Sequence, residues 1–139
     1  MATLAEKGQE MSVAVNTHSK RILALVNDLF FIAKIGDTAR FLGYSIEFSG
    51  SAPEFFERLA RAQPDLIIAD LTSSGVDISA VLHQLKGDPQ HPSVPILGYT
   101  THVDWKRTAP LHDQCTKAVT KDTLSRNLPD LIREMIDEH

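Results

Sequence analysis

Apolar and polar residues follow two different spacings along the chain from Lys20 onward. Short continuous apolar runs are typical of strands covered on both faces, and apolar residues three or four apart are typical of helices. The runs that predict strands are 21–26, 44–48, 66–69, 96–99 and 117–119. Helical spacing fills the segments between these runs and the last segment of the chain. The pattern therefore predicts five strands that alternate with five helices.

Two of the predicted helices have clear start or stop signals. The first runs from Leu29 to about Leu42, and Gly43 follows it as a stop. The second begins at the sequence Ser51-Ala-Pro-Glu54, which is a capping box with an early proline. Both signals lie at the ends of apolar segments, so they indicate where these helices begin and end.

The second half of the chain is less regular. Residues 78–86 predict a third helix, and residues 87–95, with three prolines, predict a loop. Residues 103–115 have no clear assignment, because Pro110 interrupts a weak helical pattern. The last helix is amphipathic and is expected to be capped near Asn127, with an apolar face made of Leu128, Leu131, Ile132, Met135 and Ile136.

This alternation predicts an α/β fold in which a parallel sheet has helices on both faces. Crossovers between parallel strands are expected to be right-handed. In such folds the polar residues that carry chemistry gather at the carboxyl ends of the strands. The strand ends are therefore the places to look for a functional site.

Composition and charge narrow the class of protein. The chain has 139 residues, enough for one domain, and we expect a flexible tail over 1–19 followed by a domain over 20–139. Its single cysteine, Cys115, cannot form an internal disulfide, which favours a reducing cytoplasm. The net charge of −4 does not favour nucleic-acid binding. No apolar run is long enough to span a membrane.

Polar residues follow four of the five predicted strands. They are the pair Asn27-Asp28, Asp70, the pair Thr100-Thr101, and the pair Thr120-Lys121. Two nearby carboxylates repel each other unless a cation lies between them, and oxygen ligands suit Mg²⁺. A carboxylate can also attack a phosphoryl group, whose charge a metal, a hydroxyl and a lysine stabilise together. The strand ends therefore predict a phosphoryl-transfer site.

Each of these residues also has a simpler interpretation. Asp70 alone could cap the next helix or turn, and Asn27 is as well explained as a turn residue as by a role near a metal. The histidines show no metal-ligand spacing and are expected at the surface, His102 at the rim of the site. Trp105 and Tyr99 are either part of a docking surface or partly buried in the core.

Four motifs resemble the receiver domain of bacterial response regulators of the chemotaxis type. They are Ile22-Leu-Ala-Leu-Val-Asn-Asp28, Pro64-Asp-Leu-Ile-Ile-Ala-Asp70, Pro95-Ile-Leu-Gly-Tyr-Thr100 and Ala118-Val-Thr-Lys121. The resemblance runs from about Arg21 to the C-terminus. It implies a flavodoxin-like fold, (βα)5, with strand order 2-1-3-4-5.

The resemblance also implies a role for each site residue. Asp70 would accept the phosphoryl group, and Thr100 and Lys121 would bind its oxygens. Asp28, Asp70, Asn27 and the backbone carbonyl of Thr72 would hold Mg²⁺. The chain would then be a signalling module, not an enzyme. Its partners would be a histidine kinase or phosphotransfer protein, a downstream protein target and, as an option, a second copy of the chain.

The chain departs from the family pattern in four places. Asn27 replaces a carboxylate, which should weaken Mg²⁺ binding, and the loop 71–77 lacks the usual Met-Pro and the following Gly. Asp122 replaces a proline that usually fixes a cis bond, and Ala118 replaces an aromatic residue that often couples to the switch hydroxyl. These changes leave open a second hypothesis, a pseudo-receiver that works as an adaptor without phosphorylation.

A third class, an enzyme or a flavin-binding protein with the same sheet topology, is weaker. A flavin phosphate would need a loop rich in Ser, Thr and Gly after the first strand, and Asn27-Asp-Leu-Phe-Phe31 is acidic and bulky instead. The sequence also lacks the glycine-rich dinucleotide motif, the P-loop motif and the serine nucleophile motif.

Overall fold

Five parallel strands form one sheet in the computed structural model, which describes residues 19–88 and 94–137. The strand order is β2-β1-β3-β4-β5, as the receiver resemblance implied. Each strand begins and ends within one residue of its predicted bounds. The strands are β1 Arg21–Leu25, β2 Ser45–Ser49, β3 Leu66–Asp70, β4 Ile96–Thr100 and β5 Lys117–Thr120. The predicted tail, apart from Ser19, and residues 89–93 of the predicted loop lie outside the described residues.

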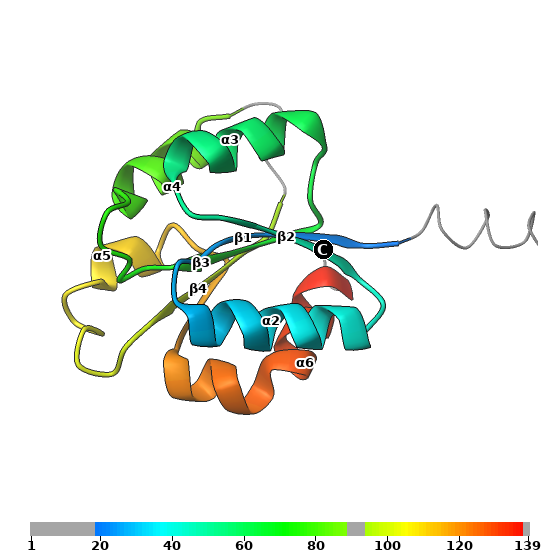
Figure 1. Ribbon diagram of the computed structural model, residues 1–139. Helices are drawn as coiled ribbons and strands as arrows, with labels where there is room; N and C mark the ends of the chain where they lie inside the picture. The colour runs from blue at the N-terminus through cyan, green and yellow to red at the C-terminus, as the bar shows by residue number, and fades with distance from the viewer. Residues whose placement is uncertain (1–18, 89–93, 138–139) are drawn as a thin grey trace, which may run out of the picture.

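Helices cover both faces of the sheet, as predicted (Figure 1). The helices α2 and α6 lie on one face, and α3 and α4 lie on the other. The short α5 lies at one end of the sheet, and its Leu111 packs on the α3 and α4 side. The described helices are α2 Leu29–Phe41, α3 Ala52–Arg61, α4 Ile78–Lys86, α5 Ala109–His112 and α6 Lys121–Asp137. None of them is long and apolar enough to cross a membrane.

The central strand β3 explains why the sequence shows continuous apolar runs. All five of its residues are buried, because helices cover both faces. Alternate residues of each strand enter opposite cores. Ile68 packs in the core beneath α2 and α6, and its neighbour Ile67 packs in the core beneath α3 and α4.

Local signals set three of the helix starts. Asp28 is the N-cap of α2, where its Oδ1 accepts a hydrogen bond from the N–H of Phe30 at 2.9 Å. Ser51 caps α3 as predicted, and Glu54 accepts a hydrogen bond from the N–H of Gly50 at 2.9 Å. Asp77 caps α4. The prediction for these helices is confirmed, and so is the stop at Gly43, which has a φ of +84° that suits glycine.

The last helix begins earlier than predicted. α6 starts at Lys121, directly after β5, and continues to Asp137. Asn127 has non-helical angles (φ −121°, ψ 21°), and Pro129 lies just beyond it. A proline inside a helix removes a donor and clashes with the preceding turn, which accounts for the kink. The sequence signal near Asn127 therefore marked a kink inside a helix, and the first helical segment, 121–126, was missed.

The segment 103–115 combines turns with one short helix. Pro110 lies in the first turn of α5, where a missing N–H leaves no hydrogen bond unmade.

Cys115 follows this helix, and its Sγ would lie 2.7 Å from a Cβ at position 98. Both methyl groups of Leu71 would lie 3.1 Å from the same atom. Gly98 is therefore required by close packing against Cys115 and Leu71.

Substituting Gly98 by alanine should destabilise the fold by about 1–3 kcal/mol, because the new methyl group overlaps Cys115 and Leu71. Cys115→Ala in the same chain should recover part of that loss, so the two changes will not be additive. Chemical denaturation of the two single variants and the double variant measures this. The control is Gly87→Ala, whose Cβ would meet its nearest neighbour at 3.7 Å and which should change the stability little. Full additivity would contradict the contact.

Cys115 should react slowly in the folded protein. Burial raises the pKa of its thiol from 9.0 to about 11, so the thiolate is about a hundredfold scarcer at pH 8. We expect iodoacetamide to modify the folded chain about 100-fold more slowly than the unfolded chain. Because the pKa is raised by folding, stability should be kept below pH 9 and lost as the pH rises towards 11. Cys115→Ala should lack this loss, and equal alkylation rates would argue against burial.

Candidate functional site

The register of the sheet brings four strand ends to one edge. Adjacent strands are aligned so that their last residues are nearly level. The register pairs at this edge are Leu25 with Ala69, Asp70 with Tyr99, and Thr100 with Thr120. The residues that follow β1 and β5 therefore lie beside the ends of β3 and β4.

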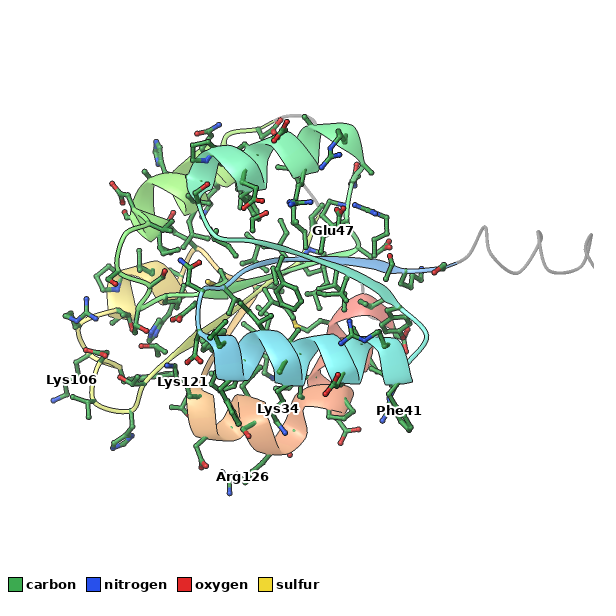
Figure 2. All side chains as sticks on the ribbon, in the orientation of Figure 1. Lys34, Phe41, Glu47, Lys106, Lys121 and Arg126 are labelled. Atoms are coloured by element: carbon green, nitrogen blue, oxygen red, sulfur yellow. The ribbon has the colours of Figure 1, made fainter. Side chains whose placement is uncertain are left out.

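Asp28 and Lys121 form a direct ion pair at this edge. Lys121 Nζ lies 3.4 Å from Asp28 Oδ2, although the two residues are far apart in the sequence. Both side chains are about one-third exposed. The ammonium group also lies 5.7 Å from the centre of the Phe31 ring, where a cation–π interaction adds to the attraction. Figure 2 shows Lys121 near the start of α2, the helix that Asp28 caps.

Asp70 ends β3 and is almost completely buried, with 5% of its surface exposed. Its Oδ1 accepts hydrogen bonds from the N–H and the hydroxyl of Thr72, at 2.9 and 2.7 Å. These bonds hold the carboxylate in one orientation and leave Oδ2 as the oxygen that Thr72 does not use. Asp77, and not Asp70, caps the next helix, so the reading of Asp70 as a helix cap is wrong. The reading of Asp70 as a turn residue holds, because its Oδ1 accepts from the N–H two residues further along the chain.

The charges of Asp70 and Asp28 both act on the hydroxyl of Tyr99. Its ring is fully buried and lies 5.0 Å from that of Phe31. Burial raises the pKa of the Tyr99 hydroxyl well above its usual value, and the charges of Asp70 and Asp28 raise it further. Both carboxylates are therefore near the same ring. Because Tyr99 is fully buried, the suggestion that it forms a docking surface with Trp105 is wrong.

Asn27 is exposed and has a structural partner. Its Nδ2 donates a hydrogen bond to the carbonyl of Gly50 at 3.1 Å, which ties the end of β1 to the loop after β2. A Cβ on residue 50 would lie 2.7 Å from Asn27 Oδ1, so this tie depends on glycine. The role of Asn27 as a structural tie is therefore real, and its role near a metal stays a prediction.

Thr100 is fully buried, and the hydrogen-bond partner of its hydroxyl is not a member of the ion pair. Its hydroxyl accepts a hydrogen bond from the hydroxyl of Thr108 at 3.2 Å. Among the described residues, no hydrogen bond joins Thr100 to Asp70 or to Lys121. The structure thus pairs Asp28 with Lys121 directly and brings Asp70 and Thr100 to the same edge without a direct bond to that pair.

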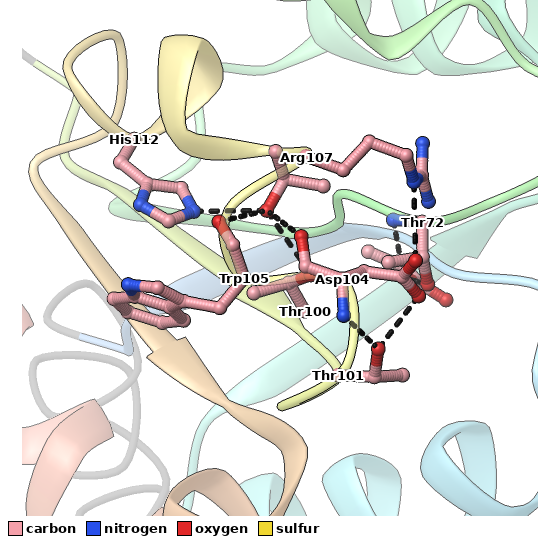
Figure 3. A network of polar contacts seen from close by, with 9 residues as sticks. Thr72, Thr100, Thr101, Asp104, Trp105, Arg107 and His112 are labelled. Atoms are coloured by element: carbon pink, nitrogen blue, oxygen red, sulfur yellow. Dashed lines mark hydrogen bonds and ion pairs between the residues drawn. The ribbon is translucent and has the colours of Figure 1, made fainter.

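Two charged residues in the loop that follows β4, Asp104 and Arg107, were not among the predicted site residues (Figure 3). Thr101 donates a hydrogen bond to Asp104 at 2.6 Å, and Arg107 pairs with the same carboxylate at 3.1 Å. The pKa of Asp104 is lowered by Thr101, then by Arg107, with a smaller contribution from Lys121. The spacing Thr-x-x-Asp was the signal for this turn. Asp104 and Arg107 add one charge of each sign beside the candidate site.

His112 is less exposed than the sequence predicted. It was expected at the surface, but it is half-buried and its ring lies 4.3 Å from that of Trp105. Trp105 is 36% exposed, so it is partly buried and partly accessible. His102 is exposed, as predicted. A shallow groove of about 410 Å³ lies beside these residues and is lined by His102, Val103, Trp105, Lys106 and Thr120.

The donors predicted for this edge are of the chemical type that Mg²⁺ prefers. Within residues 19–88 and 94–137, no three His, Cys, Asp or Glu residues form a cluster that could hold a metal ion. The predicted set instead combines the carboxylates of Asp28 and Asp70 with the amide of Asn27 and the carbonyl of Thr72. These are hard oxygen donors, and Mg²⁺ in proteins is commonly held by one or two carboxylates plus water and phosphate oxygens.

Comparisons with known proteins find the fold in solved structures. No family model matches the sequence, and no curated protein matches it. The chemotaxis response regulator CheY4 of Vibrio cholerae is 17% identical, with a TM-score of 0.73 over 84% of this chain and 98% of that chain. A CheY-like receiver domain protein from Methanospirillum hungatei JF-1 is 20% identical, with a TM-score of 0.72 over 86% and 95%.

A third solved structure is the signal receiver domain of a signal transduction histidine kinase from Syntrophus aciditrophicus. It is 21% identical, with a TM-score of 0.74 over 86% of this chain and 92% of that chain. At such low identities the likeness concerns the backbone arrangement. The resemblance stated from four short motifs is confirmed at this level: the chain has the flavodoxin-like fold of CheY-like response regulator receiver domains.

Proposed function

We propose that this chain is a receiver module that accepts a phosphoryl group on Asp70 and signals through a protein partner. The observation that carries the proposal is the arrangement at one sheet edge. A buried carboxylate, Asp70, ends the central strand beside the ion pair of Asp28 and Lys121. Asp70 supplies a nucleophile, Asp28 a negative charge and Lys121 a positive charge, and phosphoryl transfer requires groups of these kinds.

Asp70 is the nucleophile in this proposal. One of its oxygens attacks the phosphorus of a phosphohistidine on a histidine kinase or phosphotransfer protein. The P–O bond forms as the P–N bond breaks, and the histidine nitrogen leaves with the electron pair and takes a proton from water. Thr72 already fixes Oδ1 with two hydrogen bonds, so Oδ2 is the expected attacking atom.

Lys121 has two partners in turn. It neutralises Asp28 in the resting chain. Asp28, Asp70, Asn27 and the carbonyl of Thr72 would hold Mg²⁺, which would supply positive charge to offset the carboxylates and the phosphoryl group. Lys121 would pair with one phosphoryl oxygen, and the hydroxyl of Thr100 would bind another.

The surface around the site suits a protein donor and a protein target. Leu29 and Phe30 follow Asp28 and are 81% and 61% exposed, which gives a donor protein apolar surface beside the carboxylates. The segment after β4 carries Val103 and Trp105 at the surface. A target protein, or a second copy of the chain, would read the state of the site there. The chain works in this proposal as a cytoplasmic signalling module and not as an enzyme.

An adaptor that works without phosphorylation is the second candidate function. Asn27 supports it, because its side chain ties two loops together and carries no charge for a metal. The junction after β5 also supports it, because Asp122 stands there in place of the proline of the family pattern. α6 starts at Lys121 without an intervening loop, and Asp122 pairs with Arg126 in its first turn at 2.8 Å. An adaptor of this kind would bind its partner equally well after Asp70→Asn.

Incubation with a small phosphodonor such as acetyl phosphate and Mg²⁺ should add one phosphoryl group to the wild-type chain. Asp70→Asn should abolish the addition, because an amide cannot form the acyl phosphate. Intact-mass spectrometry measures the product, and EDTA should prevent it. The matched control is Asp77→Asn, which keeps a helix-capping side chain at α4 and should be labelled like the wild type.

Two results would reject the phosphoryl-acceptor proposal. One is a wild-type chain that stays unlabelled with Mg²⁺ and phosphodonor in excess, and the other is equal labelling of Asp70→Asn. Unlabelled wild type together with partner binding that ignores Asp70→Asn would establish the adaptor instead.

Asn27→Asp should raise the affinity for Mg²⁺ on the order of tenfold, because it adds a second full charge next to Asp28. It should also cost about 1 kcal/mol of stability without the metal, because the hydrogen bond to Gly50 is lost. Calorimetric Mg²⁺ titration and denaturation with and without Mg²⁺ measure both effects. Asn27→Ala separates them, since it loses the tie without adding charge. If both variants bind Mg²⁺ like the wild type, Asn27 serves only as a tie.

A further inference from the structure

Two buried threonines connect the candidate site to the segment after β4. Thr100 and Thr108 are 0% and 1% exposed, and their hydroxyl oxygens lie 3.2 Å apart. Thr108 occupies the N-cap position of α5, but its hydroxyl makes no capping bond to that helix. A threonine at this position normally satisfies a helix N–H. Here the hydroxyl is used for other partners.

The hydroxyl of Thr108 is shared among several hydrogen-bonding partners. It lies 2.9 Å from Nε2 of His112, 3.0 Å from the carbonyl of Asp104 and 3.3 Å from the carbonyl of Trp105. With Thr100, that makes four neighbours for a group that has one hydrogen and two lone pairs. The partners therefore compete, and a change at Thr100 alters which of the others Thr108 can serve.

His112 extends the network to the surface. Its ring is 4.3 Å from that of Trp105, with 54° between the two planes (Figure 3). Trp105 is 36% exposed and is followed by Lys106, which is exposed. A chain of contacts thus runs from a fully buried hydroxyl at a strand end to an aromatic ring at the surface.

No aromatic side chain of β5 offers another route. β5 consists of Lys117, Ala118, Val119 and Thr120. Ala118 of β5 stands opposite Gly98 of β4, so both residues of this register pair are small. The Thr108 network is built from the neighbouring segment 104–112 instead.

We propose that Thr108 couples the hydroxyl of Thr100 to the His112–Trp105 pair, so that a change in the hydrogen bonding of Thr100 changes the packing of Trp105 at the surface. The part of this proposal that concerns phosphorylation rests on the proposed function of Asp70. When Thr100 turns its hydroxyl towards a phosphoryl oxygen, the oxygen that accepted the hydrogen bond from Thr108 moves away and this contact is lost. Thr108 then rearranges among its three remaining neighbours, and His112 and Trp105 move with it. In this proposal, Thr108 and His112 are positioning residues.

Trp105 is the only tryptophan in the chain, so its indole N–H signal in NMR spectra and its fluorescence report on this pair alone. In the resting chain, Thr100→Val and Thr108→Val should each shift the indole signal by more than its linewidth. The double variant should shift it no further than Thr108→Val alone. Thr108→Ser keeps the hydroxyl and should restore the wild-type signal. The control is Thr38→Val on α2, which removes a hydroxyl outside the network.

Three results in the resting chain would overturn the coupling. They are an unchanged indole signal in Thr100→Val, additive shifts in the double variant, and a Thr108→Ser signal like that of Thr108→Val. The last two would indicate that the variants act only through packing. If Thr100→Val does not fold, the comparison of Thr108→Val with Thr108→Ser, which needs no change at residue 100, decides the question.

Addition of beryllofluoride and Mg²⁺ tests the coupling in the active state. The wild type should show shifts of the Asp70 and Lys121 amides together with a shift of Trp105. Thr108→Val should keep the amide shifts and lose the Trp105 shift. Amide shifts without a Trp105 response in the wild type would overturn the coupling and leave the proposed function intact. Absent amide shifts would overturn the proposed function, while the resting-chain comparison still decides the coupling.

Discussion

The pairing of parallel strands in one register is the constraint on which the candidate site depends. Asp70 is level with Tyr99, and Thr100 with Thr120, so residues distant in the sequence meet at one edge. A slip by a single residue would move each side chain to the opposite face of its strand. The register is held by burial on both faces, since Leu66 and Ile68 of β3 pack in one core and Ile67 packs in the other. The chemistry at the edge is therefore a consequence of how the apolar residues pack beneath it.

Both carboxylates of the candidate site have partners within the chain. Asp28 caps a helix through one carboxylate oxygen and pairs with Lys121 through the other. Asp70 is held by Thr72. Each buried or half-buried carboxylate thus has a partner that compensates for lost hydration. A ligand of Asp28 would have to compete with Lys121 and the helix N–H group, whereas Asp70 keeps one carboxylate oxygen that Thr72 does not use.

Much of this arrangement could be predicted from the sequence, because strand burial and helix capping are local signals. The runs before Asp28 and Asp70 gave the strands and the edge correctly. The kink at Asn127 and the early start of α6 were missed, because Pro129 has the same local signature at a kink as at a helix start. The partners of His112 and Tyr99 could not be predicted, because they depend on how separate segments pack. Whether a lone histidine or tyrosine is buried is a tertiary property that a residue's neighbours in sequence do not encode.

The junction between β5 and α6 has a consequence for how the lysine can act. Lys121 is the first residue of a helix that begins where a paired strand ends, so its backbone is held from both sides. Its Cα has little freedom to travel. The reach of the ammonium group, which lies over the Phe31 ring, is then set by rotations about the bonds of the four-methylene side chain. Because the backbone of Lys121 is fixed, the rotamer of its side chain determines which anion the ammonium group contacts.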